Sequence, residues 1–482
     1  MTKYITVIGL EVHAELKTKS KAFCSCSTEF GAPPNTHVCP VCLGMPGSLP
    51  VLNKQVVEYA ITAGLALNCE IQKFNQFDRK NYFYPDLAKG YQISELYKPI
   101  CLGGEINIHL EGQEPKRIGV TRIHMEEDAG KLVHSGATIK TSDSSAVDYN
   151  RAGVPLIEIV SEPDMRSSAE ARAYMEKLKA ILEYTDVCDC KMQEGSLRCD
   201  ANISVMPEGA TEFGTRAEIK NLNSFRALEK AIDFEVERQI DLIEDGEKVI
   251  QETRTWDDAK SETLSMRSKE EAHDYRYFPE PDLVPIVIDD AWIARSRAAL
   301  PELPAAREAR LIKDCGLKEY DAALIVATKA MAEYFDQALK NTEDAKGLAN
   351  WLLGDVSAYL NNENIEITDF PVSPEHLGEL VSLIKKGTLS SKLGKKVFTE
   401  MLKEDKAPKQ LVKELGLEQV SDTGAIEKFV DEVLAENPQS VEDFKAGKGR
   451  AVGFLVGQVM KKSHGKANPQ MVNKMLVEKM NK

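Results

Sequence analysis

The sequence predicts an α+β protein whose mixed core with flanking helices is followed by an all-helical domain and a small helical tail domain. Three observations favour this organisation. Strand-like and helical patterns interleave through residues 1–290 without the regular rhythm of a doubly wound sheet. Strand patterns vanish after about Asp289. A polar break at 404–408 then separates a helical block, residues 291–408, from a tail, residues 409–482.

The elements of the core follow from their periodicity. Alternation of apolar and polar side chains predicts strands over residues 4–16, 105–110, 117–125 and 155–160. Apolar residues at helical spacing predict helices over residues 56–67, 167–184 and 225–244. Ser167 with Glu170 fits a capping box at the start of the second helix, and Gly246 fits the stop of the third. In the helical block, Ser373 before Pro374 predicts a helix start.

Composition excludes several classes of protein. The 482 residues are 43% hydrophobic and 28% charged, as in an ordinary globular protein, and the length predicts more than one domain. No run of 18 apolar residues and no targeting segment is present, so we expect a cytoplasmic protein that crosses no membrane. Ten cysteines in this length are too few for a disulfide scaffold, and Cys188-x-Cys190 has the character of ordinary buried cysteine.

The charge of the chain is divided unevenly. The whole chain has a formal charge of -15, yet residues 444–482 hold nine basic residues and one acidic residue. A basic cluster at the start of a helix, on a glycine-containing loop, is a plausible phosphate contact. The alternative is a solvated cationic face beside an acidic body. The candidate nucleic-acid contacts are Lys448, Arg450, Lys461, Lys462 and Lys466.

Four cysteines fall in two close pairs. Cys24-x-Cys26 is followed after twelve residues by Cys39-x-x-Cys42. Two thiolate pairs on tight turns supply four soft ligands in a tetrahedron, which is typical of structural zinc. A site saturated by four cysteines has no open position, so its role would be in folding. The alternatives are four free thiols at chance spacing, or His37 in place of one thiol.

Carboxylates and one imidazole form a second constellation. Strand alternation over residues 8–16 puts Glu11, His13 and Glu15 on one side and apolar residues on the other. Glu158 stands alone in a strongly apolar strand. A buried glutamate is costly unless it is paired or bound to a cation.

Three consecutive carboxylates, Glu126, Glu127 and Asp128, end another predicted strand. Together with Glu11, His13 and Glu158 they would suit a hard divalent ion such as Mg²⁺, which holds phosphate oxygens. The alternative is a set of separate surface and salt-bridged carboxylates.

Three polar segments complete the candidates. Residues 77–86 and 274–282 interleave basic and aromatic side chains, which either grip phosphates and bases or form interface loops with buried rings. Residues 218–224 are densely polar just before a helix, where a cap already accounts for Asn223 or Ser224. No complete phosphate-binding loop, dinucleotide fingerprint or nucleophile elbow is present, so any ATP site is of a less common type.

Taken together, these motifs resemble the B subunits of the tRNA-dependent glutamyl/aspartyl amidotransferases. The resemblance covers essentially the whole chain. The matching stretches are residues 9–13, 77–86, 124–131, 155–164, 194–202, 218–225, 274–282, 447–458 and 467–470.

This resemblance implies a reaction and partners. ATP would phosphorylate the side-chain carboxylate of mischarged Glu-tRNA(Gln) or Asp-tRNA(Asn), and ammonia would displace the phosphate to form the amide. The ammonia would come by a channel from glutamine hydrolysis in an amidase A subunit, and a small C subunit would wrap the pair. The protein would be a carbon–nitrogen ligase of protein biosynthesis, with a β-rich cradle holding the active site and a tail gripping tRNA.

The resemblance also assigns residues. The catalytic positions would be Glu11, His13, Glu127 and Glu158. The Mg²⁺ ligands would come from Glu11, His13, Glu126, Glu127 and Glu158, with Asp128 as an alternative to its neighbours. The contacts to ATP or phosphate would be Arg79, Lys80 and Arg276. The four cysteines match the zinc ligands of many members of the family.

Two other functions fit parts of the sequence. The cysteine cluster and basic tail also suit a non-enzymatic RNA-binding zinc protein, which would bind RNA without turning over ATP. Glu11 and His13 also suit a carboxylate-bound metal hydrolase, which would turn over substrate without a partner. The length of the motif match favours the amidotransferase over both.

Overall fold

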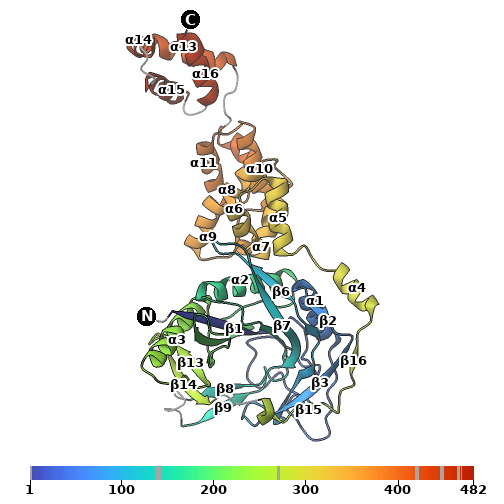
Figure 1. Cartoon of the computed structure of the whole chain (residues 1–482). Coiled ribbons are helices and arrows are strands. Elements are labelled where there is room, and N and C mark those ends of the chain that lie inside the picture. Colours follow the sequence, from blue (N-terminus) through green and yellow to red (C-terminus); the bar gives the residue numbers. More distant parts are fainter. Residues whose placement is uncertain are drawn as a thin grey trace. The chain divides into compact units, whose positions relative to one another are not determined.

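The computed structural model describes residues 3–135, 143–268, 272–417, 423–445, 450–463, 467 and 469–481. The chain divides into two compact units, Met1–Pro304 and Ala305–Lys482 (Figure 1). The first unit runs beyond the predicted boundary at residue 290. Helix α4 (Asp290–Ala298) explains this, because Trp292 and Ile293 on it, and Leu300 and Leu303 after it, pack against the core of the first unit.

The first unit is built on a ten-stranded sheet in which β1 lies near the middle. Its order is β14-β13-β12-β11-β1-β10-β7-β5-β2, with β6 also paired to β7. Neighbours pair antiparallel, apart from the parallel pair β12 and β13. The strands are β1 (Tyr4–Glu15), β2 (Glu70–Ile71), β5 (Cys101–Leu102), β6 (Glu105–Ile108), β7 (Lys116–Glu127), β10 (Pro155–Ser161), β11 (Leu197–Pro207), β12 (Ala217–Lys220), β13 (Glu252–Asp257) and β14 (Glu262–Ser268).

Burial along β1 confirms the predicted alternation. Leu10, Val12 and Ala14 are at most 1% exposed and belong to the hydrophobic core, whereas Glu11 and His13 lie on the other face and are partly exposed. One face of the middle strand therefore serves the core, and the other is left for polar side chains.

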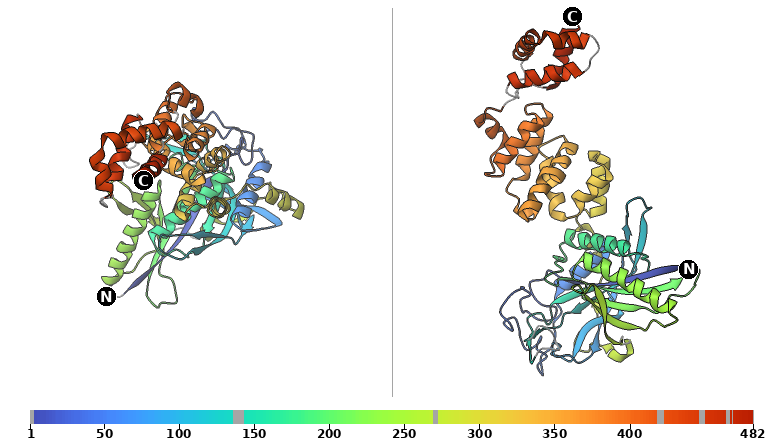
Figure 2. Two further views of the ribbon diagram at one scale, coloured as in Figure 1. Left: turned by 90° about the horizontal axis from the view of Figure 1, so that it is seen from above. Right: turned by 90° about the vertical axis from the view of Figure 1, so that its left-hand side faces the viewer.

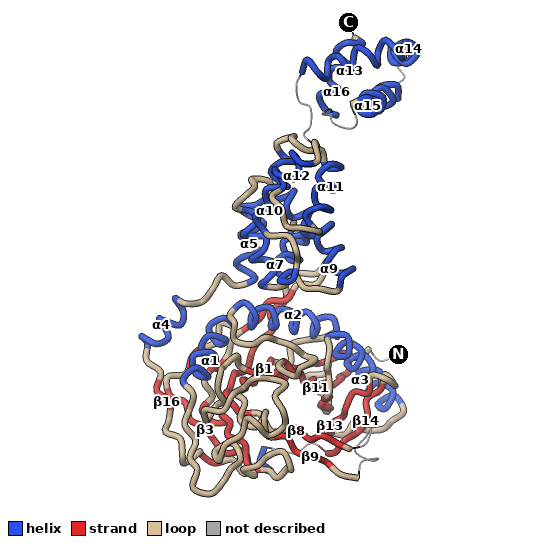
Figure 3. The backbone as a smooth tube through the Cα atoms, turned by 180° about the vertical axis from the view of Figure 1, so that it is seen from behind, coloured by secondary structure: helices blue, strands red, loops and turns tan. Residues whose placement is uncertain are grey.

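Three helices lie along the sheet (Figures 2 and 3). They are α1 (Lys54–Ala66), α2 (Ser168–Tyr184) and α3 (Phe225–Glu244). Ser167 caps α2 by accepting from the Glu170 N–H, as predicted. The Glu170 carboxylate, however, accepts from the Arg166 N–H at 2.7 Å and not from that of Ser167, so the capping box is only half formed.

Two smaller sheets complete the first unit. Strand β3 (Phe74–Asn81) pairs with β4 (Tyr91–Lys98), β15 (Phe278–Pro279) and β16 (Ile286–Val287). Strands β8 (Lys131–His134) and β9 (Ser145–Asp148) form a separate pair. A short 3₁₀ helix, Ala272–Tyr275, precedes β15. The pairing of β3 with β15 brings together the two polar-aromatic segments that the sequence singled out.

The described residues of the second unit form helices and connecting loops and no named strand, as predicted. One hydrophobic core is formed by α5 (Pro304–Cys315), α6 (Glu319–Val326), α7 (Lys329–Leu339), α8 (Ala345–Trp351), a π-helical turn (Leu352–Val356), α9 (Ser357–Glu363), a 3₁₀ turn (Ile367–Asp369), α10 (Pro374–Lys385), α11 (Ser391–Met401) and α12 (Pro408–Glu414). Leu411 and Val412 belong to it, so this core extends past the predicted boundary at 408.

A separate core joins the last four helices, α13 (Thr423–Glu436), α14 (Pro438–Lys445), α15 (Arg450–Lys462) and α16 (Pro469–Met480). Among the described helices of the chain, none combines the length and apolarity needed to cross a membrane.

Candidate active-site pocket and metal centre

Strand register gathers polar side chains on the outer face of β1. His13 lies opposite Glu158 on β10 and opposite Arg198 on β11. Glu158 in turn lies opposite His124 on β7. A row of ionisable side chains therefore crosses four adjacent strands.

The centre of this row is a compact group of two imidazoles and two carboxylates. His13 Nε2 lies 3.3 Å from Glu126 Oε1 and 3.4 Å from Glu158 Oε2, and His124 Nε2 lies 3.1 Å from the same Glu158 oxygen. Gln92 Nε2 donates to Glu126 Oε2 at 3.1 Å. Donor atoms of His13, Glu126 and Glu158 lie within 4.8 Å of one another, which is close enough to hold one cation.

Burial and neighbouring charges have opposite effects on the pKa values of His13 and Glu158. Burial lowers the pKa of His13, but the Glu158 and Glu126 carboxylates outweigh it and raise that pKa to about 9. For Glu158, burial acts to raise the pKa, but His124 and His13 hold it well below its usual range. Without a metal, the group is thus a protonated imidazole between carboxylates. A cation that bound there would have to displace that proton.

A second charged group adjoins the first. Asp128 is paired with Arg198 and lies 3.4 Å from Arg151 Nε. Burial raises the pKa of Glu15, and the neighbouring Asp128 raises it further, to about 8. Asp128 therefore carries the negative charge beside the two guanidinium groups, while Glu15 keeps a proton at neutral pH.

The structure separates Glu127 from its neighbours. Alternation along β7 puts His124 and Glu126 on one face and Glu127 on the other, and Asp128 follows directly after the strand. The Glu127 carboxylate pairs with Lys89 Nζ and accepts from the Ile93 N–H at 3.0 Å. Of the three alternatives left open by the sequence, Glu126 is the one that joins His13 and Glu158.

A cavity of about 500 Å³ opens over this polar face. Among the predicted site residues, His13, Lys80, Glu126 and Asp128 line it. Glu11, in the same strand, accepts from Asn202 Nδ2 at 2.8 Å and is outside the group that could hold a cation. Tyr82 and Lys220, from the two candidate segments 77–86 and 218–224, also line it, whereas sequence reasoning did not single out four other lining residues: Gln92, Arg151, Arg198 and Asp200.

The three candidate phosphate contacts have different surroundings. Lys80 lines the cavity, with Nζ 4.9 Å from the centre of the Tyr275 ring. Arg79 donates to Glu280 at 2.8 and 2.9 Å and to Asp282 at 2.9 Å, so a buried carboxylate already holds it. Arg276 is exposed, and its carbonyl accepts from Asn81 Nδ2 at 2.9 Å. The structure brings only Lys80 to the cavity.

The polar segment before α3 is also part of the cavity. Lys220, at the end of β12, pairs with Asp200 on β11, and both line the wall. Asn221 has a φ of 68° and donates to the Trp256 carbonyl at 2.9 Å. A bulky β-branched residue would be strained there. Ser224, and not Asn223, is the helix cap.

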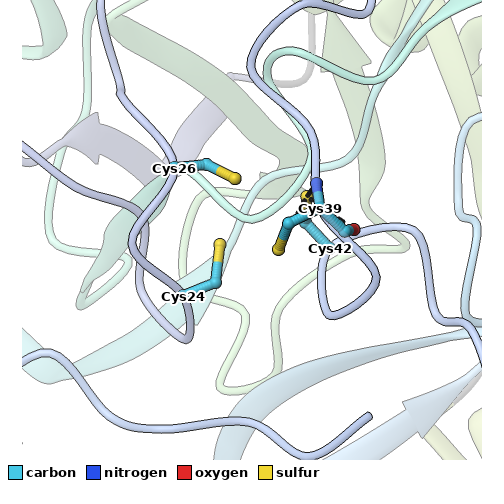
Figure 4. Close-up of side chains that lie close together, drawn as sticks. All are labelled: Cys24, Cys26, Cys39 and Cys42. Atoms are coloured by element: carbon cyan, nitrogen blue, oxygen red, sulfur yellow. Dashed lines mark hydrogen bonds between the residues drawn. The ribbon is translucent and has the colours of Figure 1, made fainter.

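The four predicted zinc ligands meet at one point (Figure 4). The sulfur atoms of Cys24, Cys26, Cys39 and Cys42 lie within 4.8 Å of one another, and those of Cys39 and Cys42 are 3.9 Å apart. A tetrahedron with Zn–S bonds of about 2.3 Å has edges of about 3.8 Å. The residues therefore fit a tetrahedral metal, and His37 is not among them.

The remaining predicted sites lie in the first unit's core or in the tail. Cys188 and Cys190 are buried in the core of the first unit and belong to no group of potential metal ligands among the described residues. In the tail, Lys448 and Lys466 fall outside the described residues. Arg450 and Lys461 are exposed on α15, whereas Lys462 donates to Glu432 at 2.7 Å and to Glu436 at 2.6 Å. Two acidic side chains of α13 therefore neutralise the charge of one lysine in the basic stretch.

Comparison with known proteins finds a family match in each of the two units. The profile of the GatB/GatE catalytic domain matches residues 6–294, and that of the GatB domain matches residues 333–480. This chain belongs to the GatB family. The catalytic-domain match contains every residue of the cavity and both candidate metal groups.

Several GatB relatives match over their full length. The B subunit of the aspartyl/glutamyl-tRNA(Asn/Gln) amidotransferase of Carboxydothermus hydrogenoformans is 57% identical over 482 residues, which is 100% of both chains. That of Moorella thermoacetica is 59% identical over 478 residues, which is 99% of this chain and 100% of the relative. That of Geobacter sulfurreducens is 58% identical over 477 residues, or 99% of each chain.

Proposed function

We propose that this chain is the tRNA-acting subunit of a cytoplasmic, glutamine-dependent aspartyl/glutamyl-tRNA amidotransferase. It would convert mischarged Glu-tRNA(Gln), Asp-tRNA(Asn) or both into the amidated forms, together with an amidase A subunit and a small C subunit. The observation that carries this proposal is the His13–Glu126–Glu158 group beneath a polar cavity, in a chain that aligns with the B subunits of such enzymes from end to end.

The chemistry needs two steps, because a carboxylate is a poor acyl donor. In the first, a side-chain oxygen of the aminoacyl group attacks the γ-phosphorus of ATP, forming an acyl phosphate and releasing ADP. In the second, ammonia attacks the acyl carbon, phosphate leaves, and ammonia loses a proton. Mg²⁺, when bound, would neutralise charge that gathers on the transferring phosphoryl group.

The chain's own residues have distinct parts in this scheme. His13, Glu126 and Glu158 would hold Mg²⁺, and Lys80, which lines the same cavity, would contact phosphate. The Asp128–Arg198 pair and Arg151 would fix cationic groups beside the reacting carboxylate. Glu11 and Glu127 would act less directly, since Asn202 and Lys89 hold them.

Two further elements are part of the proposal. Cys24, Cys26, Cys39 and Cys42 would bind a structural Zn²⁺, because four thiolates leave it no open position. The exposed Arg450 and Lys461 on α15, with their neighbours in the basic stretch, would contact tRNA phosphates.

One assay tests the proposal. The chain is combined with its amidase and small partners, ATP, Mg²⁺, glutamine and either mischarged tRNA, and the aminoacyl group is analysed after deacylation. We expect amidated product that depends on every component. The His13→Ala variant should lose amidation while the partner's glutaminase stays competent. Failure to amidate either tRNA would refute the proposal, and turnover by this chain alone would favour a metal hydrolase.

A further inference from the structure

Lys21 is an unusual lysine, because it is completely buried beside the four-cysteine group. Its Nζ donates to the carbonyl oxygens of His37 at 2.7 Å and Tyr149 at 3.3 Å, and to Cys42 Sγ at 3.6 Å. A buried ammonium is costly unless an opposite charge compensates it. Of these three acceptors, only the sulfur can carry a full negative charge.

Tyr149 belongs to a segment that runs alongside the cysteine loop. His37 N–H donates to Asn150 Oδ1 at 2.8 Å, and Asn150 Nδ2 donates to the Pro33 carbonyl at 2.7 Å. Tyr149 N–H donates to Asn35 Oδ1 at 2.8 Å. These hydrogen bonds connect the loop between the two cysteine pairs to residues 149–154. We refer to those residues as the 149–154 segment.

The far side of the 149–154 segment faces the cavity. Arg151 lines the cavity and donates to the carbonyls of Ala129 at 3.1 Å and Gly130 at 2.8 Å. Gly153 N–H donates to the Asp128 carbonyl at 2.9 Å, and Asp128 N–H donates to the Val154 carbonyl at 2.8 Å. Movement of this segment would therefore shift Arg151 and Asp128 together.

Lys21 fills the space between the cysteines and this segment. The Gly153 carbonyl accepts from Ala22 N–H at 2.8 Å, so the backbones are also joined. A Cβ added at Gly153 would lie 3.5 Å from Lys21 Cδ and 3.7 Å from Cys42 Cβ. These are ordinary van der Waals distances, so the segment lies beside both side chains. A displacement of Cys42 would reach the segment through Lys21, which contacts both Cys42 Sγ and the Tyr149 carbonyl.

We propose that Lys21 is a positioning residue that couples metal binding by the four cysteines to the 149–154 segment, and through it to Arg151 at the cavity. This inference rests on the metal-binding role proposed for the cysteines. A bound metal fixes the position of the Cys42 sulfur, and Lys21, which contacts that sulfur, then holds the Tyr149 carbonyl in place. Removal of the metal frees the cysteine turns, and Lys21 loses its fixed partner.

The test compares the full-length wild-type chain with Lys21→Met, which keeps the length of the side chain but not its charge. Lys19→Met, at an exposed lysine two residues away, is the matched control. Zinc content is measured first, then the rate of zinc loss to a chelator, and then hydrogen exchange of peptides covering residues 149–154, with and without zinc. The absorption bands of the cobalt-substituted protein report the hydrogen bond to sulfur directly.

We expect zinc removal to raise exchange in the 149–154 segment of the wild-type chain about tenfold or more. In Lys21→Met, hydrogen exchange in this segment should already be high and should change little on zinc removal. The variant should also release zinc about 10–100-fold faster, which is the size of effect seen when a residue that hydrogen-bonds a metal ligand is removed. The cobalt–thiolate band should shift. Lys19→Met should match the wild-type chain in all four measurements.

The possible results distinguish the metal-binding role of the four cysteines from the coupling through Lys21. Wild-type protein that binds no zinc would overturn both the metal role and the coupling. Zinc binding with unchanged zinc loss, cobalt spectrum and exchange in Lys21→Met would overturn the coupling alone. Should Lys21→Met fail to fold, the wild-type comparison still decides, because equal exchange with and without zinc contradicts the coupling.

Discussion

His13 Nε2 lies 3.3 Å from Glu126 Oε1, whereas the next carboxylate along the chain, Glu127, is paired with Lys89 on the other side of the strand. Two adjacent glutamates therefore have different surroundings. One belongs to the candidate cation site, and the other links β7 to Lys89 and to the Ile93 N–H of β4.

This difference predicts different effects for the two glutamine variants. Glu126→Gln should weaken Mg²⁺ binding by at least about 10–100-fold, the loss typical of an outer partner of a metal ligand. Glu127→Gln should leave Mg²⁺ affinity within a few-fold but lower the free energy of unfolding by about 3 kcal/mol, because it breaks a mostly buried ion pair. Calorimetric Mg²⁺ titration and urea unfolding measure the two effects. A reversed pattern would show that Glu127 is the ligand.

Magnesium binding at this group should depend on pH. The carboxylates raise the pKa of His13 to about 9, and a metal ligand must give up its proton. Affinity should therefore rise as pH rises towards 9, by at most about tenfold per unit for one proton. Calorimetry in buffers of different ionisation enthalpy should detect the released proton at pH 7.5. Equal affinity at pH 7 and pH 9 would show that His13 is not a ligand.

Glu95 provides a separate test of stability against pH. It is 1% exposed, its Oε2 accepts from the Met125 and Ile100 N–H groups, and burial holds its pKa well above the usual range. The folded chain keeps this proton where the unfolded chain has lost it. The stability of the wild-type chain should therefore fall as pH rises above about 4.5, until the folded pKa is reached.

Glu95→Gln removes that dependence, since the amide does not titrate. The variant should gain on the wild-type chain as pH rises, by at most about 1.4 kcal/mol per unit. Urea midpoints at pH 6 and pH 9 measure this margin, with Glu29→Gln at an exposed loop residue as the control. A margin that stays constant between the two pH values would mean that Glu95 is ionised in the folded chain.

In the tail, neighbouring lysines should contribute unequally to tRNA binding. Lys461 is exposed, whereas Lys462 is held by Glu432 and Glu436. Lys461→Ala should weaken tRNA binding and reduce the slope of log affinity against log salt by about 1. Lys462→Ala should change both quantities less. Filter binding across a range of salt concentrations compares them, and a larger effect at Lys462 would mean that tRNA displaces the α13 carboxylates.

Local pattern was enough to predict the elements but not the site. Helix α3 spans the residues that its apolar spacing predicted, and alternation along β1 placed Glu11 and His13 on the polar face. The same alternation along β7 would have put His124, Glu126 and Asp128 on one face and Glu127 on the other. That signal was present in the sequence and would have included His124.

The other missed residues had no such local signal. Arg198 and Asp200 reach the cavity only because β11 pairs with β1 in one register, and a shift of one residue would turn both away. Arg151 depends on the turns around Gly153. Register across the sheet is set by contacts between distant segments, and a single sequence does not reveal it. The cysteine ligands were predictable, since two close pairs define their own geometry.

The place of β1 in the middle of the sheet has a consequence for biosynthesis. Asn202, which donates to Glu11, lies 191 residues further along the chain. At about 5–20 residues per second, a ribosome needs roughly 10–40 seconds to make that length. Through this interval β1 lacks its β11 partner, and unpaired apolar strands are sites of aggregation. We therefore expect the nascent chain to need protection by chaperones most at its first strand, until β11 has emerged.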